Sequence, residues 1–500
     1  MTQGKAYWMG RRGWLDPAQA IGDDGGRQWC GEQGWAGTVR SAKKDDRRTM
    51  TIDERFLETH AGSAALHAEA ARLLPGGITH DIRHFEPFPI YVERAAGCRK
   101  WDVDGNEIID FVMGHGALLY GHAHPLLVDA VTAQIQRGTH YGASHPGEVE
   151  WARLVVELVP SAEKVRFVGS GTEATMMAAR LARSATGRTK LLKLREHFHG
   201  WNDSWGVELV TQPSGELVGL PRELAEVVTV VDQHDEAAIE AELATGEYAA
   251  LICEPGGAHW GALPLEPAML GAYRSMTEST GTLLIFDEVV TGFRASEHCY
   301  QGLTGVMPDL TTLAKIVAGG LPGGAVAGRA ALLDQIAITP SAAPRPDGTR
   351  VLHPGTFNAN PLTAAAGVAA LRGLQDGAPV QAATAAGERL CRGWNEAIRS
   401  AEAPGAAYCQ GSMVHLVLGE DVPPPGDGLG WNFAAAGRRL TTPRTRPAIE
   451  WPFRRALLSH GVDLMGMGAL ASAVHSDGDV DQAIEAFSGA LGDLRRESIL

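Results

Sequence analysis

The sequence of 500 residues has few cysteines and keeps them far apart. None belongs to a C-x-x-C pair, and no histidine cluster lies at metal-ligand spacing; the six cysteines are Cys30, Cys98, Cys253, Cys299, Cys391 and Cys409. This spacing argues against a zinc site and against a disulfide-stapled secreted scaffold. We therefore expect no metal site and a location in the reducing cytoplasm.

Long apolar runs and basic runs are also missing. The sequence has no stretch of the ~18 uncharged apolar residues that a membrane helix needs, and no apolar segment typical of a signal peptide follows its first basic residues. Lys and Arg number 44 against 59 Asp and Glu, which gives a net charge of −15. We therefore expect neither a membrane nor a nucleic acid as a partner.

The chain is long enough for two or three compact units. Residues 1–50 are rich in Gly, Trp and charge without a sustained period, which predicts a poorly ordered extension. The alternative is an irregular arm that belongs to the fold, and Met50 is a candidate for the natural start. We predict that segments 51–125 and 376–500 form a smaller α+β domain beside a large domain over residues 126–375.

From about residue 165, short β-branched runs alternate with helical stretches, which is typical of a mainly parallel sheet between helices. The helices expected between the strands include EATMMAARLARSA, EAAIEAEL and AMLGAYRSMTES, and the expected strands are KVRFV, TKLLKL, EVVTVV, YAALICE, TLLIFDE and LTTLA. Open α/β sheets bind ligands at the carboxyl ends of their strands. Candidate functional residues are therefore expected in the loops that follow these strands.

The stretch FVGSGTEATMMAAR (167–180) predicts a strand, a turn of small residues and a helix. Ser170, Gly171 and Thr172 would lie at the start of the helix. Backbone N–H groups and the helix dipole at such a place bind a phosphate well. An ordinary Ser/Thr helix cap is the alternative.

A second stretch, LLIFDEVVTGFR (283–294), ends an apolar strand in Asp287 and Glu288. Alternation sends the two side chains to opposite faces of the sheet, so that one carboxylate can face a ligand. A carboxylate at the end of a buried strand is costly unless a cation meets it. A structural ion pair is the alternative to a site role.

Lys315 is the only charged side chain between Leu310 and Gly328. A desolvated lysine has a lowered pKa and becomes an amine nucleophile that can form an imine with an aldehyde. A phosphate cradle, a buried acid and a nucleophilic lysine are together what pyridoxal phosphate requires. The residues therefore predict that this cofactor binds here.

The sequence resembles the class III aminotransferases of fold type I, and within them the branch of glutamate-1-semialdehyde aminomutase and β-amino acid aminotransferases. The resemblance covers about residues 60 to 495. It rests on motifs that occur in the family's order: PGGITHDIRHF, WDVDGNEIIDF, GHAHP, GSGTEA, FHG, EP, DEVVTGFR, LAKIVAGGLP and HPGTFNANPLTAAAG. It implies an α/β fold with a mainly parallel seven-stranded sheet and a smaller α+β domain made from both chain ends.

The resemblance also implies roles for individual residues. Lys315 would form the internal aldimine with pyridoxal phosphate, and Asp287 would bind the ring nitrogen. Phe198 and Val289 would cover the two faces of the ring, and Phe198 stands where the family more often has Tyr. The phosphate would be held by Ser170, Gly171 and Thr172.

Further implied residues complete the expected site. His199 of the FHG motif and Glu254 of the CEP segment would lie around the cofactor, with a satisfied strand-end acid as the alternative for Glu254. Thr356 would reach the phosphate from the neighbouring subunit, so that the smallest working unit is a homodimer. Arg83 would hold the substrate carboxylate, with a surface ion pair as the alternative.

Two departures from the aminomutase pattern bear on the reaction. His115 stands where the aminomutase has a tryptophan. The C-terminal stretch LMGMGALASAVHS has no acid, whereas the aminomutase has a pocket glutamate in the matching stretch. We therefore predict an aminotransferase that moves an amino group from an amino acid, with β- and ω-amino acids among the candidates, to a keto acid or aldehyde, and we place His115 at the substrate. The alternatives are a glutamate-1-semialdehyde 2,1-aminomutase and, less favoured, a catalytically silent binding protein.

Overall fold

The computed structural model describes residues 50–207, 219–339, 350–436 and 445–500, all within one compact unit, Met50–Leu500. The extension expected over residues 1–49 lies outside the described residues. The predicted boundaries near residues 125 and 375 stay predictions, because contacts join Met50–Leu500 into a single unit. Among the described helices, none has both the length and the apolar composition for crossing a membrane.

A seven-stranded sheet forms the centre of the larger part of this unit, in the order β4-β11-β10-β9-β7-β5-β6. All of its strands run in the same direction except β11, which is antiparallel to both of its neighbours. The strands are β4 (Lys164–Val168), β5 (Lys190–Leu194), β6 (Val228–Val231), β7 (Tyr248–Cys253), β9 (Leu283–Asp287), β10 (Leu310–Ala314) and β11 (Gly324–Gly328), and the two-residue β8 (Leu263–Pro264) lies apart from them. The predicted α/β class with a mainly parallel sheet is confirmed.

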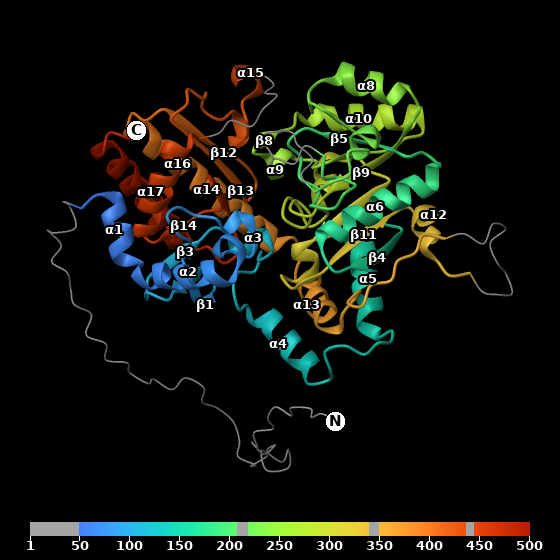
Figure 1. Ribbon diagram of the computed structural model, residues 1–500, viewed down its shortest axis with the longest axis horizontal. Helices are drawn as coiled ribbons and strands as arrows, with labels where there is room; N and C mark the ends of the chain where they lie inside the picture. The colour runs from blue at the N-terminus through green and yellow to red at the C-terminus, as the bar shows by residue number, and fades with distance from the viewer. Residues whose placement is uncertain (1–49, 208–218, 340–349, 437–444) are drawn as a thin grey trace, which may run out of the picture. The chain divides into compact units, whose positions relative to one another are not determined.

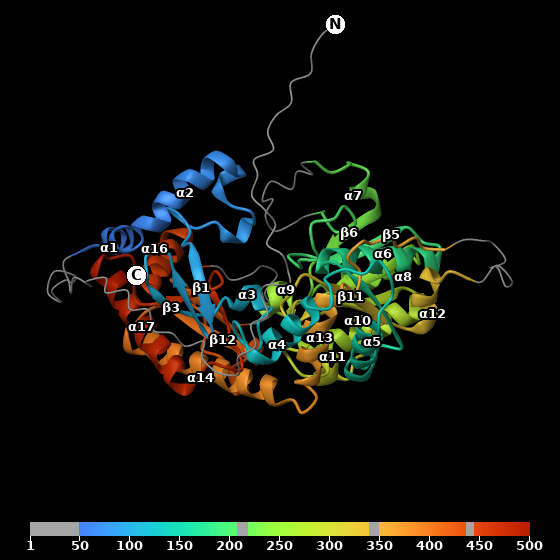
Figure 2. The same ribbon diagram turned by 90° about the horizontal axis from the view of Figure 1, so that it is seen from below.

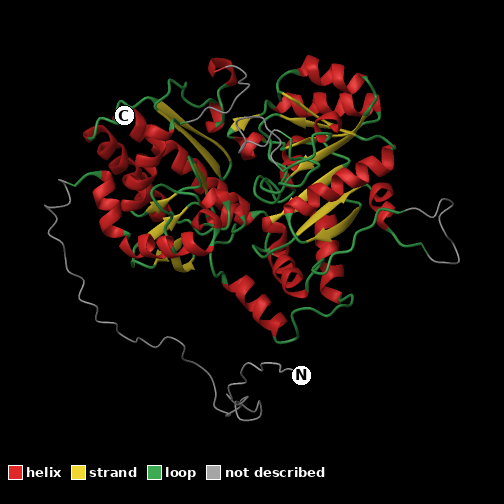
Figure 3. Cartoon of the chain, in the orientation of Figure 1, coloured by secondary structure: helices red, strands yellow, loops and turns green. Residues whose placement is uncertain are grey.

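Helices cover both faces of this sheet (Figure 3). On one face α6 (Gly171–Thr186) packs on β10 and β11, and Figure 1 shows α6 beside β11. On the other face lie α8 (Glu236–Ala244) and α10 (Pro267–Thr280). The remaining helices of this part are α4 (Pro125–Ile135), α5 (Pro146–Leu158), α7 (Leu224–Val227), α9 (Ala258–Gly261), α11 (Cys299–Thr304), α12 (Ala330–Leu333), α13 (Pro361–Arg372), η5 (Lys315–Ala318) and η6 (Asp334–Ile336).

Strand alternation explains how two separate core clusters form on the two faces. Ile252 of β7 packs in the cluster with α6, while its neighbour Leu251 packs in the cluster with α8 and α10. Both side chains are fully buried, which is typical of a strand covered on both faces. The apolar run of β7 is thus explained by its central place in the sheet.

The two ends of the described chain build a second, smaller part. Strands from both ends share one sheet in the order β1-β2-β3-β14, and a three-stranded sheet has the order β12-β13-β15. These strands are β1 (Val92–Ala96), β2 (Arg99–Asp102), β3 (Glu107–Asp110), β12 (Gly405–Gln410), β13 (Met413–Leu418), β14 (Val462–Asp463) and β15 (Gly468–Leu470). This arrangement confirms the predicted α+β part made from both ends.

Its helices share a core across long sequence distances. Figure 2 shows α1 beside α16, and α16 packs in turn on α17. Trp394, Phe453 and Phe487 lie in the same buried cluster as Ile52. The helical elements are α1 (Ile52–Thr59), α2 (Ala61–Leu73), η3 (Pro75–Gly77), η4 (Asp81–Arg83), α3 (Met113–Gly116), α14 (Ala378–Ser400), η7 (Asp427–Leu429), α15 (Phe433–Ala436), α16 (Pro447–Ser459) and α17 (Asp477–Arg496).

Strand β11 is not among the strands that the sequence pattern predicts. Its sequence GAVAG has a single β-branched residue, and all five of its residues are buried between β4 and β10. A Cβ atom at Gly324 would lie 2.8 Å from the carbonyl oxygens of Leu313 and Ser170. Small residues are therefore needed here for close packing, and they hide the strand from propensity arguments.

The turn that carries Lys315 is supported from behind by Trp151 of α5. Trp151 is fully buried, stacks on Phe167 with ring centroids 3.8 Å apart, and donates its Nε1–H to the carbonyl of Val317 at 2.8 Å. A tryptophan in such a place combines a large buried apolar area with one directed hydrogen bond. The strand β4 and the Lys315 turn are thus tied to the same side chain.

Trp151→Ala should lower the free energy of unfolding by about 3–5 kcal/mol, because it removes a fully buried ring and leaves the Val317 carbonyl without its donor. Urea unfolding followed by circular dichroism measures this loss. Trp201→Ala is the matched control, since Trp201 is 77% exposed and its loss should change stability by no more than about 0.5 kcal/mol. Equal effects of the two substitutions would contradict the assigned support.

Candidate active site

Lys315 and Asp287 lie at the carboxyl ends of neighbouring parallel strands. Asp287 is the last residue of β9 and pairs in register with Thr312 of β10, and Lys315 follows the end of β10 directly. The backbone of Lys315 has φ of +58°, a left-handed conformation that non-glycine residues adopt rarely. The sheet therefore brings the two residues together at the edge where α/β proteins bind ligands.

Protein atoms surround most of the Lys315 side chain, and a part of its surface stays accessible to solvent. Burial lowers the pKa of the Lys315 amine, and Asp287 and Glu254 act in the opposite direction. The nearby guanidinium of Arg294 lowers this pKa further. A lowered pKa leaves a larger fraction of the amine neutral and able to act as a nucleophile or a base.

Asp287 is held from three sides. Its Oδ2 lies 2.7 Å from Nδ1 of His199, and its Oδ1 accepts hydrogen bonds of 3.1 Å from the Thr312 hydroxyl and the Val289 N–H. Burial is the largest cause that lowers the pKa of His199, so the imidazole is neutral near pH 7 and donates Nδ1–H to the carboxylate. His199 is thus placed behind Asp287, where it orients the carboxylate.

Glu254 organises the loop that presents Phe198. Its Oε1 accepts from the backbone N–H groups of Phe198 and His259, at 2.9 and 3.1 Å, and its Oε2 accepts from that of Trp260 at 2.7 Å. Burial raises the pKa of Glu254 to about 7 although these three bonds act against it. The carboxylate is thus satisfied by backbone donors, and the expected place of Glu254 around the cofactor stays a prediction.

The start of α6 lies where the sequence predicts a phosphate cradle, which stays a prediction. The Ser170 hydroxyl caps the helix by accepting from the Glu173 N–H at 3.2 Å, while the N–H groups of Gly171 and Thr172 lie in the first turn, where no intrahelical carbonyl reaches them. A Cβ atom at Gly171 would lie 3.0 Å from the side chain of Val289, so the helix start approaches Val289 closely. Ser170 thus acts as a cap, and the two N–H groups remain for an anion.

These residues fit a flat ring that carries a phosphate and an aldehyde. The unpaired N–H groups of the first turn suit the phosphate, the buried carboxylate of Asp287 suits a ring nitrogen, and the Lys315 amine suits the aldehyde. Phe198 is 49% exposed, so its ring face is available for stacking. The fit rests on the helix start, the acid and the lysine of one chain.

His115, predicted at the substrate, lies close to His80. Its ring centroid is 5.2 Å from that of His80, and burial, followed by the charges of His80, Arg83, Lys315 and Lys100, lowers the pKa of His115 to about 4, so His115 is neutral near pH 7. Arg83 is exposed and donates to the Thr79 hydroxyl at 2.8 Å. The permanent positive charge of Arg83 near His115 favours an anionic group on the substrate.

The side chain of Thr356 is exposed in the single chain. Its predicted contact with a phosphate belongs to a neighbouring subunit and stays a prediction. The same exposure is found at Leu352 and Phe357, which are 62% and 65% exposed. Large apolar side chains exposed together are typical of an interaction surface.

Sequence reasoning gave no role to Arg294, although it lies in the motif DEVVTGFR. Its side chain is fully buried and donates to the carbonyls of Ala471 and Gly116, at 2.7 and 3.0 Å, and to the Ser412 hydroxyl at 3.2 Å. Arg294 therefore fixes the turn that carries His115. In the sequence, only the position of this charged residue directly after the small and apolar residues VVTGF pointed to such a role.

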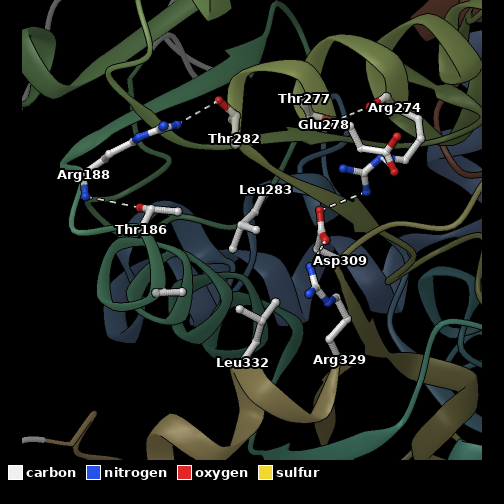
Figure 4. Close-up of a pocket in the computed structure, with 12 residues that line it drawn as sticks. Thr186, Arg188, Arg274, Thr277, Glu278, Thr282, Leu283, Asp309, Arg329 and Leu332 are labelled. Carbon is white, nitrogen blue, oxygen red and sulfur yellow. Dashed lines mark hydrogen bonds and ion pairs between the residues drawn. The ribbon is translucent and has the colours of Figure 1, made fainter.

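A separate cavity of about 400 Å³ lies at the opposite edge of the sheet, where β9 begins at Leu283. Figure 4 shows Arg274 and Arg329 both pointing at Asp309, which precedes β10. None of the residues that line it belongs to the group around Lys315. It is therefore distinct from the candidate active site.

Comparison with known proteins agrees with this geometry. The fold is that of the fold type I pyridoxal phosphate transferases, and a solved omega-transaminase from Sphaerobacter thermophilus superimposes with a TM-score of 0.76 at 32% identity, covering 87% of this chain and 98% of that one. The family model "Aminotransferase class-III" matches residues 82–468. The chain belongs to the class III aminotransferase family, and its cofactor is pyridoxal phosphate.

Individual relatives carry different reactions. A glutamate-1-semialdehyde 2,1-aminomutase of Desulforudis audaxviator is 38% identical over 442 residues, covering 85% of this chain and 96% of that protein. The structure of a beta-phenylalanine aminotransferase from Variovorax paradoxus has a TM-score of 0.75 at 26% identity, covering 89% and 99% of the two chains. The family is therefore established more firmly than the reaction.

Glu254→Gln should remove a pH-dependent part of the stability. The folded carboxyl titrates at about 7 instead of its ordinary 4.5, so the folded state binds more protons between these values and stability falls as pH rises through this window. Relative to the variant, the wild type should therefore lose up to about 3 kcal/mol between pH 4.5 and pH 7. Urea unfolding at pH 5 and pH 8 measures the difference.

The matched control is Glu485→Gln on the exposed face of α17. Titration of the buried Glu288 occurs in all three proteins and cancels from the comparison. A constant difference between wild type and Glu254→Gln at both pH values would show that Glu254 stays ionised in the folded protein and would contradict the burial argument.

Proposed function

We propose that the protein is an aminotransferase that moves an amino group from a carboxylate-bearing amino acid, with β- and ω-amino acids among the candidates, to a keto acid or aldehyde. The observation that carries the proposal is the largely enclosed Lys315 amine beside Asp287, with the guanidinium of Arg83 and the neutral imidazole of His115 next to it. When bound, pyridoxal phosphate acts as an electron sink that stabilises the carbanion left by proton loss from the substrate.

The chain's own residues have distinct tasks in this proposal. Lys315 Nζ takes the proton from the substrate carbon that bears the amino group. The protonated amine then gives this proton to a different carbon atom. Asp287, oriented by His199, would hold the ring nitrogen in its protonated form. Phe198 and Val289 would lie against the two faces of the ring and keep it in place.

Holding the phosphate is the task of the α6 N-terminus, where Gly171 and Thr172 supply backbone N–H groups and Ser170 fixes the helix start. Thr356 adds a hydroxyl from the neighbouring subunit in a homodimer. The exposed Leu352 and Phe357 beside Thr356 support such an interface. We place the enzyme in the cytoplasm, since the five described cysteines are all free thiols.

Two further functions are considered. An aminomutase, which moves the amino group within one molecule, is favoured by the 38% identity to the aminomutase of Desulforudis audaxviator. It is disfavoured by His115 in place of tryptophan and by the missing acid in the stretch 464–476. A silent binding protein is the least favoured, because Lys315, Asp287 and the helix start are all in place.

A single-turnover assay separates these functions. An amino acid donor alone, without acceptor, should convert the bound cofactor to its aminated form and release one equivalent of keto product, because a transaminase stops after the first half-reaction. Absorbance of the cofactor and quantification of the keto product measure it. Lys315→Ala should bind cofactor and lose this conversion.

Catalytic isomerisation of glutamate-1-semialdehyde without a second substrate would replace the aminotransferase proposal by the aminomutase. Absence of both reactions over a panel of α-, β- and ω-amino acids, in a protein that binds the cofactor, would favour the silent protein. Full turnover by Lys315→Ala would overturn the assignment of the lysine in either enzyme.

Arg83→Ala should lower kcat/KM for carboxylated donors by the equivalent of about 2–4 kcal/mol of transition-state stabilisation, because it removes a charge-assisted pair with the substrate carboxylate. Amines without a carboxylate should be affected little. Steady-state kinetics with β-alanine and with a simple alkylamine measure the contrast. Arg72→Ala, at an exposed position of α2, is the control. An equal loss for both substrates would remove Arg83 from carboxylate binding.

A further inference from the structure

The cavity of about 400 Å³ at the starting ends of the strands has an unusual balance of charge. Arg188, Arg274 and Arg329 line it together with only two carboxylates, those of Asp309 and Glu278. The arginines come from three places in the chain: the segment before β5, the helix α10 and the residue after β11. The sheet thus gathers an excess of positive charge at the end of the strands opposite to the one that carries Lys315.

Three hydrogen bonds occupy most of the accepting capacity of the carboxylate between two of these arginines. Asp309 Oδ1 accepts from Arg329 at 3.0 Å, and Oδ2 accepts from Arg274 and from the Leu284 N–H, each at 2.9 Å. The Asp309 side chain is only 8% exposed. Figure 4 shows it enclosed between the two guanidiniums. The second acid, Glu278, is 70% exposed and reaches only Nε of Arg274, at 3.4 Å.

Each guanidinium keeps N–H groups that no described acceptor engages. Among the described residues, the Arg329 guanidinium has one hydrogen bond, to Asp309, and the Arg329 side chain is 57% exposed. Arg188 has no acidic partner among the described residues; it donates to the carbonyls of Tyr248 and Thr280 and to the Thr282 hydroxyl. Because arginine has five donors, the cavity is rich in donors and poor in acceptors.

An apolar surface lies among these donors. Leu283 and Leu332 line the same cavity, and Figure 4 shows both between Arg188 and Arg329. A ligand that satisfies the cavity therefore combines several acceptor oxygens with an apolar body. Planar guanidiniums bind carboxylates and phosphates through paired, charge-assisted hydrogen bonds.

We propose that this cavity is a second binding site, for a small organic anion whose carboxylate or phosphate contacts Arg329 and Arg274 and whose apolar part lies on Leu283 and Leu332. The site is independent of the proposed aminotransferase reaction. Its ligand approaches at the beginnings of β9 and β10, the strands whose far ends carry Asp287 and Lys315.

Isothermal titration of the full-length holoenzyme, saturated with pyridoxal phosphate, tests the proposal with phenyl phosphate and benzoate as probes. At least one of them should bind saturably, and the two probes distinguish a phosphate ligand from a carboxylate ligand. Arg329→Gln should weaken this binding about tenfold or more, because it removes a charge-assisted contact. Phenol, which has the same ring without the charge, should not bind.

Arg372→Gln is the matched control, because Arg372 is 58% exposed and pairs with Glu150 at 2.7 Å, much as Arg329 pairs with Asp309. It should leave the affinity unchanged. Arg83→Gln controls for entry into the active site and should also leave it unchanged. Circular dichroism verifies that Arg329→Gln is folded, and the exposure of its side chain makes this the expected result.

The proposal is overturned by any of three outcomes: no saturable binding of either anion, equal affinity in Arg329→Gln and wild type, or loss of binding in Arg83→Gln instead. In each case the arginines serve only to tie the ends of helices and strands together. Transaminase activity plays no part in the readout, so failure of the proposed function leaves this test intact.

Discussion

Arg294, a buried residue with no acidic partner among the described residues, holds the segments around the site in place. Arg294 donates to acceptors from three separate segments: Gly116, Ser412 and Ala471. A buried cation without such acceptors is very costly, and burial already lowers the pKa of Arg294 to about 10. The three segments are therefore held in one arrangement. The same charge acts on Lys315, so the group that fixes the architecture also adjusts the amine.

The end of β9 shows how one pair of neighbouring acids serves two purposes. Asp287 faces His199 and the site, while Glu288 points the other way, is fully buried, and accepts from the backbone N–H groups of Tyr300 and Gln301. Burial raises the pKa of Glu288 to about 7. Strand alternation separates the two carboxylates, so that both can exist at one strand end without direct repulsion.

Much of the fold could be predicted from local patterns. The expected strands ending near Val168, Leu194, Cys253, Asp287 and Ala314 are all present, because apolar runs bounded by turn residues determine strands in buried parallel sheets. The place of Lys315 followed from its isolation among apolar residues. Strand β11 could not be predicted in this way, since its small residues are selected by close backbone approach to its neighbours.

The contacts that complete the site could not be predicted from the sequence, and the reason differs from the one that hides strand β11. The bonds of Glu254 to Phe198 and Trp260, and those of Arg294 to Gly116 and Ala471, join residues that no spacing rule relates. Glu254 was expected near the cofactor or as a satisfied acid, and only the three backbone donors show how it shapes the loop. Such pairings depend on tertiary structure and are visible only once the chain is folded.

The backbone at His115 limits how this family member can change during evolution. The four residues Met113, Gly114, His115 and Gly116 all have positive φ, from 46° to 85°. Non-glycine residues adopt this region rarely, and β-branched residues are strongly disfavoured there. A β-branched side chain at position 115 would therefore strain the backbone of this turn, whereas glycine, asparagine or aspartate would fit it.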